Sequence, residues 1–480
     1  METIQNYWSI CPKCCGCGKK SSMSRRQSKH RYEIALEKFE VDKKSGIVCQ
    51  RPKITQSLCD NCTGSGLIAS TTAIIAEREK FPHIAIIGAG IGGVALAVAC
   101  LHRNIPFTLY EKDKSFEDRA QGYGLTLQQA SNAMKAFGLF SLKDGMQTTR
   151  HLVHDPEGNQ ISEWGMKTHA KLEKPPKRIN VHIPRQSLRL ALLNQLGTTD
   201  ALKWGYRLLN FKECEDKRME LCFQVNGELK NTKADLVVGA DGIYSAVRSA
   251  LIKEEACPLQ YIGYMVILGI CSLKSIQETT STLFDSETVF QTVNGSERIY
   301  VMPFSFDSVM WQFSFPISES NAKKLASLGS DALKQEACLR ATWHDPIPQM
   351  LRATLPSQIS GYPVYDRNLL KPELLENAPS ATLIGDAAHP MTPFKGQGAN
   401  QALLDALLLA RSIWKGCTNT PNWKEIGLRK TILEEFENEM LDRSASKVKD
   451  SAKACELLHS KDVLRRCNQP KGRLFSIEKI

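Results

Sequence analysis

The sequence predicts an α/β fold, in which a βαβ domain carries an inserted antiparallel sheet and is followed by C-terminal helices. Three observations support this prediction. After His83, a strand-like run, a glycine-rich turn and a helix-like run follow one another directly. Between about residues 259 and 363 the chain is instead rich in β-branched and aromatic residues with alternating polarity. From about residue 421, apolar residues recur at helical spacing.

We expect three regions along the 480-residue chain, because this length exceeds one ordinary core. Residues 1–80 form a small Cys-rich module with a basic linker. Residues 81–420 form the βαβ domain, with substrate-side insertions at about 147–181 and 259–363. Residues 421–480 form a C-terminal helical region.

The N-terminal region concentrates positive charge and cysteine. From Lys13 to Lys53, twelve Lys or Arg residues stand against four acids, and seven of the sixteen cysteines precede Ser65. A basic arm of this kind suits a nucleic-acid or acidic protein partner, or a membrane surface, and a solvated linker is the alternative. The opening residues show no secretory signal, which favours a cytoplasmic protein with reduced thiols.

The same region repeats one cysteine pattern. "CPKCCGCG" and "CDNCTGSG" both fit C-x-x-C-x-G-x-G, which resembles the zinc repeat of DnaJ-type chaperones. Cys11, Cys14, Cys59 and Cys62 supply four thiolates, enough for one tetrahedral structural Zn²⁺. A redox-active cysteine cluster and an inert leader are the alternatives.

An uncharged run from Ile84 to Leu101 is long enough to suggest a membrane span. It contains Gly88, Gly90 and Gly93 in the spacing G-x-G-x-x-G, and Glu111 ends the next strand-like segment. Strand, turn, helix, strand and acid together predict a dinucleotide site rather than a transmembrane segment. The turn amides would bind a pyrophosphate, and Glu111 would accept from a ribose hydroxyl.

Two later motifs also join a strand to a helix. In "ADLVVGADGIYSAVRSAL" the strand ends at Asp241-Gly242. In "ATLIGDAAHPMTPFKGQGANQALLDALLLAR" the strand ends at Gly385-Asp386, and a glycine-rich turn opens a long helix. This turn comprises Gly396, Gln397, Gly398 and Asn400.

With all three motifs in order, residues 83 to about 455 resemble the single-component FAD-dependent aromatic-hydroxylase family, which includes para-hydroxybenzoate hydroxylase and the tetracycline-inactivating monooxygenase. The resemblance implies FAD as cofactor and a Rossmann-like FAD-binding domain. It also marks Arg119 in "RAQGYGLTLQ" and Arg185 in "IPRQSLRLALL" as cofactor-binding residues. It implies that Asp386 accepts from a ribityl hydroxyl, that the Gly396–Asn400 turn faces the flavin, and that Asp241 braces the site.

The resemblance further implies the reaction. NAD(P)H, a transient co-substrate, would reduce FAD, and a flavin C4a-hydroperoxide formed with O2 would hydroxylate a small, apolar or aromatic substrate. No catalytic side chain is then required, and we expect His389 to pack its loop. Whether Lys395 faces the flavin or solvent stays open. The alternative functions are a flavin-dependent reductase of an isoprenoid-type substrate and an FAD-containing adaptor with a zinc-mediated partner site.

Overall fold

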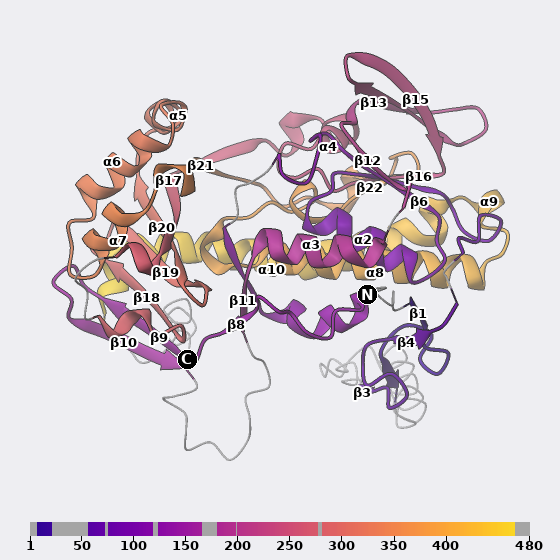
Figure 1. Cartoon of the computed structure of the whole chain (residues 1–480). Helices are drawn as coiled ribbons and strands as arrows, with labels where there is room; N and C mark the ends of the chain where they lie inside the picture. The colour runs from indigo at the N-terminus through magenta and orange to yellow at the C-terminus, as the bar shows by residue number, and fades with distance from the viewer. Residues whose placement is uncertain are drawn as a thin grey trace, which may run out of the picture.

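A computed structural model describes residues 7–21, 56–72, 75–118, 123–165, 180–197, 199–276 and 281–465 (Figure 1). Its centre is a five-stranded parallel sheet in the order β12-β6-β5-β16-β22. The strands are β5 (Ile84–Ile87), β6 (Phe107–Glu111), β12 (Leu202–Trp204), β16 (Leu236–Gly239) and β22 (Ala381–Leu383). Because the strands are parallel, the three motif turns lie at the same edge of the sheet. The predicted α/β class is confirmed.

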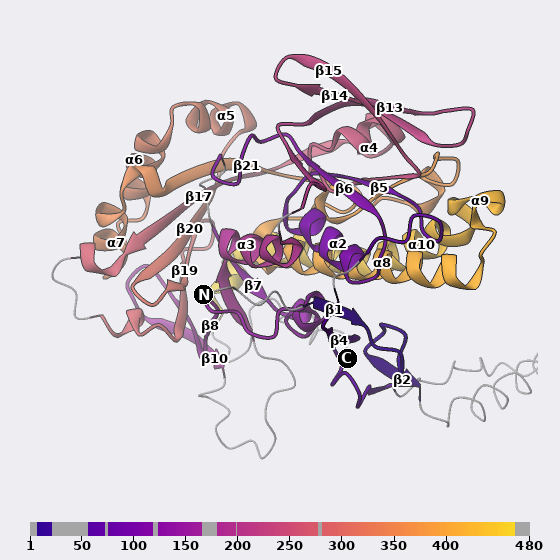
Figure 2. The same ribbon diagram turned by 45° about the vertical axis from the view of Figure 1, so that its right-hand side comes forward.

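Helices cover this sheet and explain the uncharged run. The run divides into the four-residue strand β5 and the eleven-residue helix α2 (Ile91–Leu101). Helices α3 (Arg185–Leu196) and α8 (Gly398–Asn419) lie beside α2 on one face of the sheet (Figures 1 and 2). Among the described residues, no helix combines the length and the hydropathy that crossing a bilayer requires.

A second, seven-stranded sheet has the order β10-β9-β18-β19-β20-β17-β21. All its neighbouring strands are antiparallel except β9 and β18, which are parallel. The strands are β9 (Arg150–His154), β10 (Gln160–Gly165), β17 (Leu259–Ser272), β18 (Thr288–Val293), β19 (Arg298–Ser305), β20 (Ser308–Pro316) and β21 (Ile359–Arg367). Asn294-Gly295 forms the turn between β18 and β19, where Gly295 has a φ of 95°.

The two faces of this sheet separate by the two-residue period of a strand. Trp311, Phe313 and Phe315 of β20 pack in one core with helices α5 (Glu319–Ser327), α6 (Ser330–Arg340) and α7 (Ile347–Ala353). Met302 and Met310 belong to a different apolar cluster on the other face. Helices α5, α6 and α7 therefore cover the first face, and the second cluster lies on the opposite side of the sheet.

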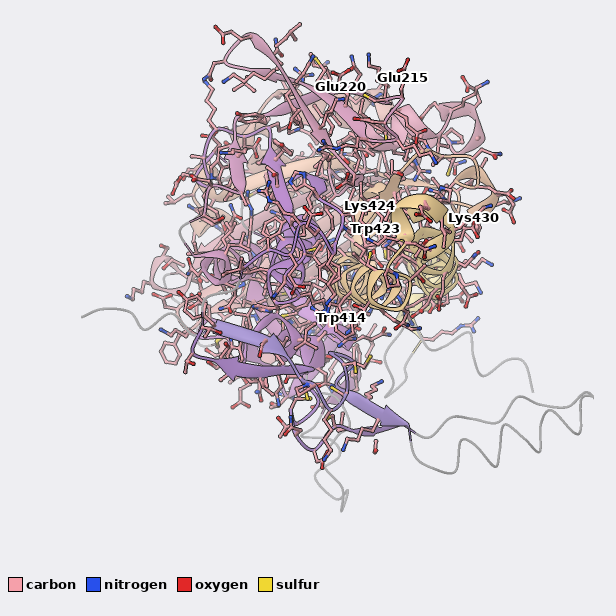
Figure 3. The ribbon with its side chains drawn as sticks, turned by 90° about the vertical axis from the view of Figure 1, so that its right-hand side faces the viewer. Glu215, Glu220, Trp414, Trp423, Lys424 and Lys430 are labelled. Carbon is pink, nitrogen blue, oxygen red and sulfur yellow. The ribbon has the colours of Figure 1, made fainter. Side chains whose placement is uncertain are left out.

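Two three-stranded sheets lie beside these, and two two-stranded sheets belong to the N-terminal module described below. One joins β7 (Gly124–Leu127), β11 (Val181–Pro184) and β8 (Met146–Gln147). The other joins β13 (Arg207–Glu213), β14 (Met219–Val225) and β15 (Glu228–Ala234), and the sequence analysis did not predict it. It projects from the top of the molecule, where Figure 3 labels Glu215 and Glu220.

The described part of the C-terminal region, up to residue 465, is mainly helical. A short helix α9 (Trp423–Ile426) and a π-helical turn (Arg429–Leu433) precede the long helix α10 (Glu434–Leu458). The remaining helices are α4 (Ala246–Leu251) and the 3-10 segment Gln129–Phe137. Further 3-10 turns span Glu254–Ala256, Leu273–Ser275, Thr282–Phe284, Pro356–Gln358, Pro372–Leu374, Gly385–Ala387, Pro393–Lys395 and Lys461–Leu464.

Candidate cofactor site

A cleft of about 330 Å³ lies at the carboxyl edge of the parallel sheet. It extends from the end of β6, past the start of α2, to the start of α8. Seven of the predicted site residues line this cleft: Gly88, Gly90, Glu111, Arg185, Asp241, Asp386 and Gly398. The sequence motifs therefore converge on one site, although Gly88 and Gly398 are 310 residues apart in the sequence. Arg119 lies outside the described residues.

Each of the three glycines of the first motif is required for a different structural reason. Gly88 has a φ of 99°, and a Cβ there would lie 2.7 Å from the Ala240 carbonyl oxygen. A Cβ at Gly93 would lie 1.9 Å from the Gly88 carbonyl oxygen, so α2 packs too closely on the turn for any side chain. Gly90 is the N-cap of α2. The nearest atom to a Cβ added at Gly90 would be Arg185 Nη2, at 3.8 Å. Of these three glycines, only Gly90 leaves open space on the side of the cleft.

Two helix N-termini face the cleft without a capping side chain. The N-cap residues Gly90 of α2 and Gln397 of α8 make no side-chain hydrogen bond to the first turn, and neither first turn contains an acid. Helix α4, by contrast, is capped by Ser245, whose hydroxyl accepts from the Arg248 amide at 2.9 Å. Free amides and the positive end of the helix dipole bind anions. This donor pattern fits a pyrophosphate at α2 and an electron-rich ring edge at α8.

Glu111 holds the first turn as well as lining the cleft. Its carboxylate accepts from the backbone amides of Ala89 at 2.7 Å and Asp113 at 3.2 Å, and the residue is 4% exposed. Arg189 of α3 donates through Nε to the Ala89 carbonyl at 2.7 Å. Arg189 stands four residues after Arg185 and therefore on the same helix face. The glycine turn is thus held from both sides.

Asp386 follows β22 and faces the cleft. Desolvation raises the pKa of its carboxyl, while the charges of His389 and Arg185 act in the opposite direction. A Cβ at Gly398 would lie 3.4 Å from Asp386 Oδ1. A glycine at the start of α8 therefore leaves room beside this carboxylate for a ligand.

The α8 turn is held rigidly by Asn400, which is fully buried. Its Oδ1 accepts from the amides of Gln128 at 2.8 Å and Ala130 at 3.2 Å. Its Nδ2 donates to the carbonyls of Thr126 at 2.8 Å and Gly396 at 2.9 Å. These four bonds use the hydrogen-bonding capacity of the Asn400 side chain inside the protein, so the side chain positions the turn.

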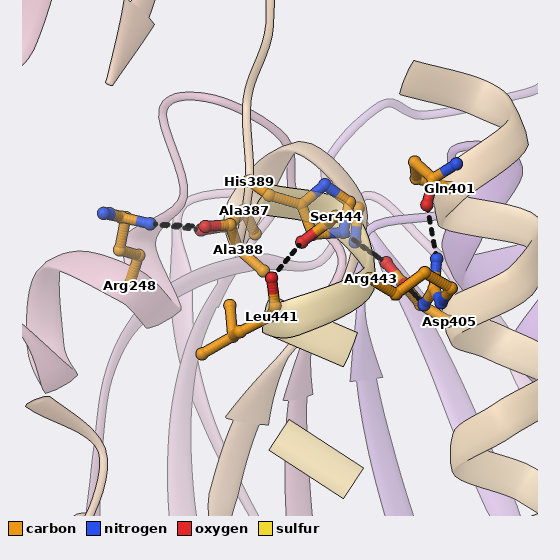
Figure 4. A network of polar contacts seen from close by, with 10 residues as sticks. Arg248, Ala387, Ala388, His389, Gln401, Asp405, Leu441, Arg443 and Ser444 are labelled. Carbon is orange, nitrogen blue, oxygen red and sulfur yellow. Dashed lines mark hydrogen bonds and ion pairs between the residues drawn. The ribbon is translucent and has the colours of Figure 1, made fainter. Parts of the chain in front are cut away.

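Behind the cleft lies a buried ionic network that the sequence analysis did not identify (Figure 4). Asp405 of α8 accepts from the Gly385 amide at 2.8 Å and contacts His389 Nε2 at 2.6 Å and Arg443 of α10 at 2.5 Å. Burial opposes ionisation of both Asp405 and His389, but their mutual attraction prevails: the pKa of Asp405 is lowered and that of His389 is raised. His389 thus fastens the loop that carries Asp386, in agreement with the expected packing role.

Asp241 supports the same loop through α4. Its carboxylate accepts from the Ala246 amide at 2.7 Å and from the Ser245 hydroxyl. Arg248 of α4 then donates to the carbonyls of Ala387 at 2.9 Å and Ala388 at 3.2 Å (Figure 4). The second and third motifs are therefore connected by direct hydrogen bonds.

Comparison with known proteins assigns the chain to a family. The FAD binding domain family matches residues 82–351 and 378–420. The chain belongs to this family. A relative named aurachin C monooxygenase/isomerase, from Stigmatella aurantiaca, is 30% identical over 335 residues, which cover 69% of this chain and 80% of the relative. An FAD-dependent urate hydroxylase of Klebsiella pneumoniae is 25% identical over 384 residues, covering 79% and 91% of the two chains. The chain is an FAD-dependent monooxygenase, an oxidoreductase with FAD as its cofactor.

Solved structures agree on the fold. The crystal structure of Klebsiella pneumoniae HpxO complexed with FAD and uric acid matches with a TM-score of 0.64 at 21% identity, over 80% of this chain and 93% of that chain. Tetracycline destructase Tet(51) matches with a TM-score of 0.55 at 17% identity, over 80% and 92%. The predicted family is confirmed.

The second face of the seven-stranded sheet packs against β7 and the turn before α8. The Met302 Cε atom lies 2.5 Å from where a Cβ at Gly124 of β7 would stand, and the Gly124 amide is 3.1 Å from Met310 Sδ. Phe394, just before α8, packs in the same cluster as Tyr300 and Met302. The same face also carries a buried cation, because the Arg298 guanidinium lies 4.8 Å from the Tyr300 ring centroid and its Nε donates to Gln291 at 2.7 Å.

The four predicted metal ligands of the monooxygenase lie together. The sulfur atoms of Cys11, Cys14, Cys59 and Cys62 are all within 4.8 Å of one another, and all four residues are buried. The Sγ–Sγ distances are 3.9 Å for Cys11–Cys59 and 3.7 Å for Cys14–Cys62. Tetrahedral zinc with Zn–S bonds of about 2.3 Å requires sulfurs about 3.8 Å apart. The four-cysteine centre fits one zinc ion.

The fold of this module explains the repeated glycines. Strand β1 (Tyr7–Ile10) pairs with β4 (Leu67–Ser70), and β2 (Lys19–Ser21) pairs with β3 (Gln56–Leu58). The amides of Gly18 and Gly66 donate to Cys14 Sγ and Cys62 Sγ, each at 3.2 Å. Gly18 and Gly66 have φ values of 71° and 80°, which glycine adopts readily. The pairing of β2 with β3 brings both cysteine pairs to one centre despite their separation in sequence.

Proposed function

We propose that this monooxygenase uses NAD(P)H and O2 to hydroxylate a small, apolar or aromatic substrate. The observation that carries the proposal is the convergence of two uncapped helix N-termini and the Asp386 carboxylate on one cleft, beside an apolar sheet face. When bound, FAD supplies the chemistry: it accepts electrons from NAD(P)H and transfers one oxygen atom of O2 to the substrate. The chain provides binding, orientation and charge stabilisation.

Each part of the cleft has a proposed role toward FAD. The α2 amides beside Gly90 bind the pyrophosphate, and Glu111 accepts from a ribose hydroxyl with its remaining lone pairs. Asp386 accepts from a ribityl hydroxyl. Arg185 donates to the pyrophosphate side of the cofactor. Arg119 is assigned to FAD only on the family resemblance.

The α8 N-terminus stabilises negative charge on the flavin ring edge. Its amides and dipole favour electron density near them, and they are fixed in place before reaction by Asn400 and Gln397. Gln397 donates to Gln128 at 2.7 Å, which in turn donates to the Lys395 carbonyl at 3.0 Å. No side chain of the protein is needed as a nucleophile.

The substrate proposal rests on the apolar cluster of the second face of the seven-stranded sheet. Tyr300, Met302, Phe304 and Met310 bring rings and thioethers together there, and the Arg298 guanidinium lies against the Tyr300 ring. Relatives are named for aromatic substrates, among them a 6-hydroxynicotinate 3-monooxygenase of Bordetella bronchiseptica. We therefore favour a planar aromatic molecule, with residues 147–181 and 259–363 forming the substrate side.

The N-terminal module, residues 1–80, is proposed to hold one structural zinc ion at the four-cysteine centre. This assignment is supported by the sulfur spacing and by the two amide–sulfur hydrogen bonds. The rest of the proposed organisation keeps residues 81–420 as the FAD-binding domain and 421–480 as a helical region. A protein or nucleic-acid partner for the basic arm, and a cytoplasmic location, also stay proposals; most of the arm lies outside the described residues.

The reaction is tested with the purified yellow protein. Under anaerobic conditions we expect NAD(P)H to bleach the flavin, and in air we expect oxygen uptake to rise with one member of a panel of hydroxylated heteroaromatic compounds. The hydroxylated product, identified by mass spectrometry with ¹⁸O2, must contain one labelled oxygen. A flavin that bleaches but never passes oxygen to any substrate would instead favour a reductase.

A further inference from the structure

The Cys-rich module rests on the two helices that begin at the FAD cleft. Figures 1 and 2 both place β1 and β4 below α2 and α8. Arg411 of α8 donates through Nε to the Gly16 carbonyl at 3.1 Å, and Arg103 Nη2 would lie 3.6 Å from a Cβ at Gly16. Trp8 of β1 packs against Phe140 in a tilted arrangement, with ring centroids 4.7 Å apart. The module is therefore packed on the FAD-binding domain.

Both arginines lie at the contact between this module and the helices, and neither has an acidic partner among the described residues. Arg103 is 2% exposed, and its Nη1 donates to the Ala99 carbonyl at 2.9 Å. Its Nη2 atom is buried and has no hydrogen-bond partner among the described residues. Within the described ranges, no carboxylate forms an ion pair with Arg103 or with the partly buried Arg411. Burial and the charge of Arg411 lower the pKa of Arg103 to about 9. Two unpaired guanidinium groups side by side are unfavourable unless a negative charge lies close to them.

The four-cysteine centre can supply that charge. Four thiolates around one Zn²⁺ carry a net charge of about −2, which equals the charge of two guanidinium groups with opposite sign. Four protonated thiols carry no charge and would leave both arginines uncompensated. Two of the four ligands, Cys14 and Cys62, belong to the electrostatic environment of Arg411, and the neighbouring Cys17 belongs to that of both arginines. The net charge of a zinc-loaded tetrathiolate thus has the sign and the size that balance the charges of Arg103 and Arg411.

We propose that Arg103 and Arg411 neutralise the zinc tetrathiolate centre, so that zinc loading fastens the N-terminal module to α2 and α8 and thereby stabilises FAD binding. The inference rests on the zinc assignment proposed above and adds two charge-balancing residues and a coupling between metal and cofactor. The coupling has a physical route. At a rise of 1.5 Å per residue, the end of α2, two residues before Arg103, lies about 15 Å from the start of that helix, and Arg411 lies about 20 Å from the start of α8. Both helices thus reach from the cofactor cleft to the metal centre.

The experiment uses full-length protein purified with FAD. Zinc content is measured by elemental analysis, and zinc loss is followed with a chromophoric chelator. The variants are Arg103→Met, Arg411→Gln and their combination. Arg411→Lys keeps the positive charge at this partly buried position. It therefore separates the effect of losing the charge from a failure of the variant to fold. Arg367→Gln is the matched control, because Arg367 is also buried but is paired with Glu254 at 2.7 Å and is not among the module's contacts.

We expect zinc affinity to fall at least about 10-fold in Arg411→Gln and further in the double variant, the usual range for partners that support metal ligands. Arg411→Lys and Arg367→Gln should retain zinc as the unchanged protein does. In the unchanged protein, chelating the zinc should weaken FAD binding by about 5-fold or more, measured from the recovery of free-flavin fluorescence. Zinc affinity unchanged in Arg411→Gln and the double variant would overturn the charge-balancing role, and FAD affinity unchanged by zinc removal would overturn the coupling. A full-length protein that takes up no zinc would refute the metal assignment itself.

Discussion

Gly90→Ala is a direct test of the proposed pyrophosphate position. Gly90 has a φ of −72° and a ψ of −174°, a conformation that alanine adopts readily. The added Cβ would meet only Arg185 Nη2, at an ordinary contact distance of 3.8 Å. In the free protein the substitution is therefore sterically tolerated, and its methyl group points toward the cleft.

The expected magnitude follows from the lost contact. At an N-cap, replacing glycine by alanine costs a fraction of a kcal/mol, and the lower entropy of the unfolded chain returns about 0.4–1 kcal/mol. The free energy of unfolding should thus stay within about 0.5 kcal/mol of the unchanged value. Displacing a phosphate from one backbone amide removes a hydrogen bond to a charged group, worth about 1.5–3 kcal/mol. The dissociation constant for FAD should therefore rise about 10- to 150-fold.

The assay titrates apoprotein with FAD and follows quenching of flavin fluorescence, while urea unfolding of the apoprotein reports stability. Gly93→Ala serves as the contrast, because its Cβ would lie 1.9 Å from a backbone oxygen and should impair folding itself. FAD binding by Gly90→Ala with unchanged affinity would show that the pyrophosphate does not approach this turn.

Two further substitutions test the support of the cleft. Asp405→Asn should lower the free energy of unfolding by about 3–5 kcal/mol, because it breaks a buried ion pair, and it should change the pH profile of stability. Because the pKa of Asp405 is lowered in the folded protein, its ionisation stabilises the fold above the unfolded-state pKa of about 3.9, and this stabilisation is lost as pH falls. Because the pKa of His389 is raised, its protonation stabilises the fold below the unfolded-state pKa of about 6.5, and this stabilisation is lost as pH rises through the raised pKa. Urea titrations across this range should find both slopes reduced in the variant, and parallel profiles would contradict the pairing. Asn400→Ala should cost roughly 2–5 kcal/mol through the buried amides of Gln128 and Ala130 that lose their acceptor, and a thermal midpoint like that of the unchanged protein would argue against this bracing role.

The sequence could predict the cleft because its determinants are local. Each motif is a strand, a turn and a helix start that are contiguous in sequence, and a parallel sheet brings such turns to one edge. The β13–β15 sheet was missed although Asn226-Gly227 separates two alternating runs, which is a hairpin signal. There, the expectation of a continuing βαβ pattern outweighed a clear local cue.

The supporting network could not be predicted in the same way. Asp405 contacts His389, sixteen residues earlier, and Arg443, thirty-eight residues later, so the pairing depends on how α8 and α10 pack. A partial signal existed: Asp405 is the only charged residue between Gly396 and Ala410. A lone acid in an apolar helix is buried and needs a partner. The sequence could thus have indicated the buried acid but not its partners.

The raised pKa of Asp386 leads to a last prediction, on the pH dependence of FAD binding. Desolvation raises this pKa above its ordinary value, while the charges of His389 and Arg185 act in the opposite direction. If a ribityl hydroxyl donates to the carboxylate, binding favours the ionised form and lowers the pKa again. Binding then releases a proton at pH values near the raised pKa, so FAD affinity should increase as pH rises through it.

A protonated Asp386 that donates to FAD would give the opposite slope, because binding would then take up a proton. Affinity measured by fluorescence quenching from acidic to neutral pH distinguishes the two directions. Asp386→Asn should remove this slope while Asp366→Asn, whose carboxyl pKa is also raised by burial but which does not line the cleft, should leave it in place. A slope that persists in Asp386→Asn would assign the titration to another group and would remove the physical basis for Asp386 as the ribityl acceptor.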